Sequence, residues 1–66
     1  MTNEEIRQVI DNYVRGRNGE RNRVILKRRI IDGITLEKLA EEFDMSVSQI
    51  KEIIYKNRTA LKDRLP

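Results

Sequence analysis

Apolar residues recur at three- and four-residue intervals through most of the chain, which is the spacing of amphipathic helices. Glycines and short polar segments interrupt this pattern, and the intervals between them predict helices over residues 3–15, 20–32, 35–43 and 46–64. No segment shows the strict apolar–polar alternation of a half-buried strand. The sequence therefore predicts an all-α fold, a small bundle of four helices.

The first predicted helix carries the clearest apolar stripe, formed by Ile6, Val9, Ile10, Tyr13 and Val14. Thr2 and Glu5 have the spacing of a capping box at its start. Two glycines and an asparagine within residues 15–19 end this helix and begin a loop. Gly33 is placed to stop the second helix, because glycine accepts the left-handed conformation that often ends a helix.

The segment 35–54 organises the rest of the chain. Thr35 is an N-cap for the third helix, and the corner 44–46 is so short that it leaves room only for a tight turn. Ser46 begins the fourth helix, with Gln49 three residues later in a second capping box. Two helices joined by so short a corner are typical of a helix-turn-helix.

Apolar residues on both sides of this corner agree with a helix-turn-helix. A helix-turn-helix needs a small residue inside its first helix, so that its second helix can cross closely, and Ala40 is this residue. We expect a core containing Leu39, Ala40, Phe43, Ile50 and Ile54. The plainer interpretation is two ordinary amphipathic helices in a bundle.

Composition narrows the function. A chain of 66 residues corresponds to one domain, and 38% of its residues are charged. It contains no cysteine and no histidine, which excludes disulfides, the usual zinc and haem sites, and the commonest general base. We therefore expect that the protein is not an enzyme and that it binds neither a metal ion nor a cofactor. Because the sequence shows neither a membrane-spanning apolar run nor a signal-peptide pattern, we expect a cytoplasmic protein without membrane contacts.

Charge is segregated along the chain although the net charge is only +3. Residues 15–31 carry seven basic side chains against one acidic, and residues 32–44 carry five acidic against one basic. Basic residues predominate again in residues 45–66. This distribution suits a local contact surface for a polyanion, although a charged surface that only aids solubility has the same composition.

If the fourth helix enters a DNA major groove, its first turns face the base edges. The candidate base-reading residues are Val47, Ser48, Lys51 and Glu52. The candidate contacts to the DNA backbone are Arg21, Arg23, Arg28, Arg29, Gln49, Tyr55, Lys56 and Arg58. The alternative is that the exposed side of the fourth helix is an ordinary solvated helix face.

From about residue 20 onward the chain resembles region 4 of the sigma-70 family, the part of bacterial sigma factors that reads the −35 promoter element. The matching residues are Asp32-Gly33, Thr35-Leu36-Glu37, Phe43-Asp44, Ile50 and Ile53. The resemblance implies a single helix-turn-helix domain over 1–66, with an N-terminal helix and loop over 1–19 and a region 4-like core over 20–66. Small phage and mobile-element regulators share this fold. The chain departs from the family pattern at Val47, Ser48 and Glu52, where the family usually has Arg, Glu and Gln.

Two functions follow from these observations as hypotheses. The first is a sequence-specific transcriptional regulator that binds double-stranded DNA, with a homodimer or RNA polymerase supplying the rest of the interface. The second is a protein-interaction module of antirepressor type that does not read DNA. It would bind RNA polymerase, a sigma factor or an anti-sigma protein through the apolar stripe Ile6, Val9, Ile10 and Tyr13.

Overall fold

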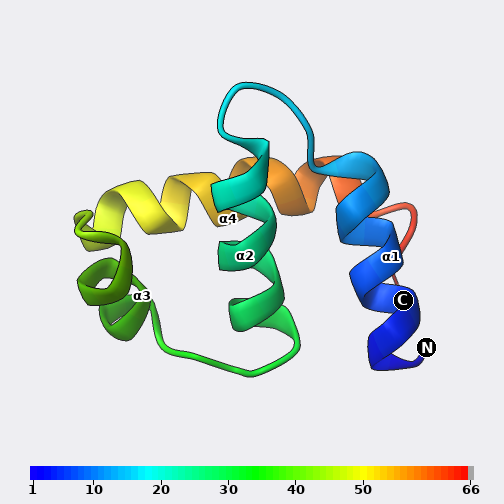
Figure 1. Cartoon of the computed structure of the whole chain (residues 1–66), viewed down its shortest axis with the longest axis horizontal. Coiled ribbons are helices and arrows are strands. Elements are labelled where there is room, and N and C mark those ends of the chain that lie inside the picture. The colour runs from blue at the N-terminus through cyan, green and yellow to red at the C-terminus, as the bar shows by residue number, and fades with distance from the viewer. Residues whose placement is uncertain (66) are drawn as a thin grey trace.

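The computed structural model describes residues 1–65, which form four helices and no strand (Figure 1). The helices are α1 (Asn3–Tyr13), α2 (Gly19–Ile30), α3 (Leu36–Phe43) and α4 (Val47–Leu61). The predicted all-α fold of four helices is confirmed, although α1, α2 and α4 end earlier than the apolar pattern indicated. Within residues 1–65, no helix combines the length and the apolar character needed to cross a membrane.

Side-chain caps fix the starts of three helices. The Thr2 hydroxyl accepts the backbone N–H of Glu5 at 3.2 Å, and the Glu5 carboxylate accepts the Thr2 N–H at 3.4 Å. Ser46 and Gln49 make the same reciprocal pair at the start of α4, at 3.1 and 2.9 Å. The Thr35 hydroxyl caps α3. Each cap satisfies backbone donors that have no partner inside the helix.

The connections around α3 use left-handed residues. Gly33, between α2 and α3, has φ +68°, and the Ile34 N–H donates to the carbonyl of Arg28 at 3.1 Å. Asp44, which ends α3, has φ +52°, a conformation that aspartate accepts more readily than most residues. The Met45 N–H then donates to Ala40 O at 2.9 Å, so the chain reverses direction within the predicted corner.

Helix α4 is the element on which the others pack. It contacts α1, α2 and α3, and α1 also packs against α2. Figure 1 shows α3 beside the N-terminal end of α4 and α1 beside its C-terminal end, with α2 crossing α4 between them. The α1–α2 contact includes an ion pair between Lys27 and Asp11 at 2.7 Å. This arrangement leaves the side of α4 that faces away from the other helices in solvent.

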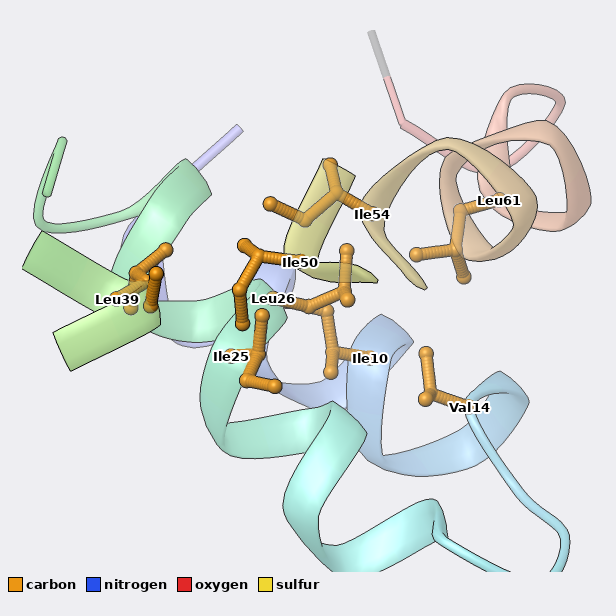
Figure 2. Close-up of a cluster of buried hydrophobic side chains, with 9 residues drawn as sticks. Ile10, Val14, Ile25, Leu26, Leu39, Ile50, Ile54 and Leu61 are labelled. Carbon is orange, nitrogen blue, oxygen red and sulfur yellow. The ribbon is translucent and has the colours of Figure 1, made fainter. Parts of the chain in front are cut away.

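The core gathers apolar residues from all four helices (Figure 2). Its buried members are Ile10, Val14, Ile25, Leu26, Leu39, Ala40, Ile50, Ile54 and Leu61. Four of the five predicted core residues are among them. The prediction for Phe43 is wrong, because its ring is only half-buried at the edge of the cluster. Phe43 lies in the last turn of α3, where it shares a surface hollow with Val24 of α2, so no helix covers its outer side.

The apolar stripe of α1 packs inside this chain. Ile10 is fully buried, and Ile6 and Val9 pack against the core. Tyr13 is 49% exposed, with the Arg64 guanidinium 4.0 Å from the centre of its ring. The surface that the protein-interaction hypothesis assigned to a partner is therefore largely occupied by the chain's own helices.

Candidate nucleic-acid interface

The outer face of α4 presents Ser48 and Glu52, and all four candidate base-reading residues, Val47, Ser48, Lys51 and Glu52, are exposed. The period of the helix directs Ser48 and Glu52 away from the buried Ile50 and Ile54. Val47 lies three residues before Ile50 and seven before Ile54, on their side of the helix, and is 39% exposed. Tyr55 continues this face, and 75% of its surface is exposed. The helical pattern therefore identified the exposed side of α4 correctly.

Glu52 and Lys56 form an ion pair on this face. The Lys56 Nζ lies 2.8 Å from Oε1 of Glu52, one turn away. The hydrogen bond and charge of Lys56 hold the pKa of Glu52 below its usual value, and Glu52 in turn raises the pKa of Lys56. At neutral pH, both groups are charged and largely compensate each other, so the middle of the face has little net charge.

One flank of α4 borders a basic groove, with a volume of about 460 Å³. Its lining residues are Arg29, Leu36, Lys51, Ile54, Tyr55, Arg58, Thr59 and Lys62. The lining contains basic side chains but no acidic one. None of these basic side chains forms an ion pair with a carboxylate within residues 1–65. Unpaired cations that border a concave surface attract anions.

The groove combines residues that sequence reasoning treated separately. Lys62 was not among the predicted DNA contacts, although its spacing from Lys51 and Arg58 puts it on the same side of α4. Arg29 comes from the last turn of α2 and reaches the groove only because α2 crosses α4. Its Nη1 donates to the carbonyl of Ile34 at 2.9 Å, which anchors the side chain and leaves its other N–H groups available.

Two of the predicted contacts to the DNA backbone, Arg28 and Arg23, instead connect elements of the fold. Arg28 is paired with Glu42, at 2.6 Å between Nη2 and Oε2. The Nη1 of Arg23 donates to the carbonyl of Val14 at 2.8 Å. Both guanidinium groups hold elements of the fold together, and neither lines the basic groove.

The opposite flank of α4 has a different character. Its groove, of about 380 Å³, is lined by Arg21, Asn22, Met45, Gln49, Glu52, Ile53, Lys56 and Asn57. The guanidinium of Arg21 donates to Oδ1 of Asn22 at 3.2 and 3.3 Å. Gln49 is engaged in the cap of α4, so its carbonyl oxygen is not free. Of the predicted contacts to the DNA backbone, three thus line the basic groove (Arg29, Tyr55 and Arg58), three line the opposite one (Arg21, Gln49 and Lys56), and Arg23 and Arg28 line neither.

The chemistry available on these surfaces is recognition of an anionic partner. Cationic side chains can hold phosphates, while Ser48 and Lys51 can bond polar groups between them. Comparison of the chain with protein-family models, curated proteins and solved structures finds no match.

Proposed function

We propose that this protein is a transcriptional regulator that binds double-stranded DNA in a sequence-specific manner. In this proposal α3 and α4 act as a helix-turn-helix, and the N-terminal half of α4 enters the major groove. The observation that carries the proposal is the groove along the flank of the exposed α4 face. It is lined by four cations that pair with no carboxylate of the described residues 1–65, namely Arg29, Lys51, Arg58 and Lys62.

The position of this groove along α4 suits two kinds of DNA contact, base contacts near the N-terminus of the helix and phosphate contacts farther along it. Ser48 and Lys51 lie in the first turns of α4 and would reach base edges, as the leading residues of a recognition helix do. Arg58 and Lys62 lie farther along the helix and would contact phosphates on one strand. Ala40 supports the close packing of α3 on α4, because it is buried and has almost no side chain to separate the helices.

A single module of this size makes a small DNA interface. Sequence-specific regulators with one such module gain affinity from a second copy or from a partner already on the DNA. Regulation by this protein would therefore require a homodimer or contact with RNA polymerase.

The first test is a fluorescence-anisotropy titration of labelled duplex DNA over a range of salt concentrations. Four to six phosphate contacts predict that log K falls with log salt with a slope of about −3 to −6. Arg58→Ala and Lys62→Ala should each make this slope shallower by about one. Arg7→Ala is the matched control, because Arg7 is an exposed arginine on α1 outside the groove. Absence of duplex binding at low salt would refute the proposal.

The second test separates base reading from anchoring. After selection of a preferred site in vitro, Lys51→Ala should weaken binding to that site by about 1–3 kcal/mol and change binding to a scrambled duplex little. Arg58→Ala should weaken both by similar factors. If Lys51→Ala and Arg58→Ala lose affinity in the same sequence-independent way, α4 is not reading bases.

A further inference from the structure

Helix α2 crosses α4 (Figure 1). It brings basic side chains to both flanks of α4. Near the C-terminus of α2, Arg29 lines the basic groove together with Arg58. Near its N-terminus, Arg21 lines the opposite groove with Gln49 and Lys56. Arg21 and Arg29 therefore lie on opposite sides of the helix that we propose to enter DNA.

The separation of these two arginines matches the width of the DNA groove. Arg29 follows Arg21 by eight positions, which corresponds to about 12 Å along a helix axis. The major groove of B-DNA is also about 12 Å wide. With α4 in that groove, one end of α2 lies beside each phosphate strand.

The loop before α2 adds a second basic residue to the Arg21 side. Arg17 is exposed and shares a surface hollow of about 390 Å³ with Arg21, Asn18 and Phe43. Glu20 also borders this hollow, but Arg17 forms no ion pair with any carboxylate in residues 1–65. Its guanidinium is therefore available to an anionic ligand.

This loop is held in place by internal contacts. The Arg23 guanidinium donates to the carbonyl of Val14, and the Gly19 N–H donates to Gly16 O at 3.0 Å. Gly19 is buried, and a Cβ at this position would lie 3.0 Å from Nη1 of Arg23. Because glycine lets Arg23 approach so closely, the loop is tied back to the end of α1. Arg17 therefore lies in a loop that these hydrogen bonds hold in place.

We infer that Arg17 and Arg21 bind the phosphates of the second DNA strand, across the major groove from the strand bound by Arg29, Arg58 and Lys62. Helix α2 then bridges the two strands behind the reading helix. This inference rests on the proposed function, since it specifies which strand each basic cluster holds. It adds Arg17 to the interface and assigns Arg21 to a different strand from Arg29.

The test uses duplexes that contain one selected site and uncharged methylphosphonate linkages on one strand at a time. The wild-type protein should lose affinity when the phosphates flanking the site are neutralised on either strand. The variant Arg17→Ala/Arg21→Ala should have a salt slope shallower by about two. It should also be insensitive to neutralisation of one strand and remain sensitive to neutralisation of the other. Arg58→Ala/Lys62→Ala should show the opposite strand preference.

The control is Arg7→Ala/Lys38→Ala, which removes two exposed charges from α1 and α3 and should keep the wild-type strand pattern. Circular dichroism checks that each variant is folded, and Arg17→Ala alone, at an exposed position, replaces the double variant if that one unfolds. Wild-type affinity and slope in the Arg17 and Arg21 variants, or equal sensitivity of the double variant to both strands, would overturn the inference. Failure of the wild-type protein to bind any duplex would instead refute the proposed function.

Discussion

The guanidinium of Arg28 binds the carboxylate of Glu42 through two hydrogen bonds, 2.9 Å from Nε to Oε1 and 2.6 Å from Nη2 to Oε2. The pair joins the last turn of α2 to the last turn of α3. Both side chains are about one-third exposed, at 35% and 32%, so water screens the pair only in part. A two-pronged arginine–carboxylate contact of this kind fixes geometry more firmly than a single ion pair does.

Arg28→Ala should therefore act on stability rather than on DNA binding. We expect Arg28→Ala and Glu42→Ala each to lower the free energy of unfolding by about 1 kcal/mol, measured by urea denaturation. The double variant should lose less than the sum, because both single changes break the same pair. A shallower DNA salt slope in Arg28→Ala, with unchanged stability, would show that Arg28 contacts phosphate as the sequence alone suggested.

Burial separates two apolar residues of α3. Leu39 is fully buried, and Leu39→Ala should cost about 2–5 kcal/mol, which is most of the stability of so small a domain. Phe43→Ala should cost less than Leu39→Ala, because the half-buried Phe43 ring already contacts solvent. Thermal and urea unfolding followed by circular dichroism measure both. A larger loss for Phe43→Ala would mean that the ring is covered in solution.

Two serines at the start of α4 allow a matched comparison, Ser46 as the N-cap and Ser48 on the exposed side of the helix. Ser46→Ala removes the hydroxyl that accepts the Gln49 N–H and should lower the free energy of unfolding by about 1 kcal/mol. Ser48→Ala, on the exposed face of the same helix, should change stability by less than about 0.5 kcal/mol. Equal effects of the two changes in urea denaturation would contradict the role of Ser46 as a cap.

The Glu52–Lys56 pair predicts a pH effect with a definite sign. The pKa of Glu52 is lowered first by its hydrogen bond to Lys56 and then by the lysine charge. The stabilisation from the pair is therefore complete above the ordinary glutamate pKa and is lost as the pH falls through the lowered value. An NMR titration of the Glu52 carboxyl should find this lowered pKa, and Lys56→Ala should raise it towards the ordinary value. An unchanged Glu52 pKa in Lys56→Ala would mean that the pair does not persist in solution.

Glu52 should also limit binding to unselected DNA. Its carboxylate lies on the exposed α4 face, where it compensates Lys56 and would repel the phosphates of a bound duplex. Glu52→Gln should therefore strengthen binding to a scrambled duplex several-fold in the anisotropy assay, mainly at low salt. Glu4→Gln on α1 removes the same charge away from this face and should have little effect. Equal gains from both substitutions would indicate a general charge effect.

The sequence alone determined the features that depend on neighbouring residues. The caps at Thr2, Thr35 and Ser46 involve residues only three positions apart, so their spacing identified the starts of α1, α3 and α4. The same holds for the exposed side of α4, because the helical period relates the inward Ile50 and Ile54 to the outward residues without reference to any other helix.

Tertiary structure decided the features that depend on where one helix passes another. Periodicity marked Phe43 as inward-facing, but only the position of α3 at the end of α4 leaves its ring partly uncovered. The periodicity of the sequence also could not distinguish Arg28 from Arg29, which are adjacent in the chain. Helix packing turns Arg28 towards Glu42 and Arg29 towards Arg58 and Lys62. Adjacent residues on a helix point about 100° apart, so the angle at which α2 crosses α4 determines which arginine stabilises the fold and which remains available to a ligand.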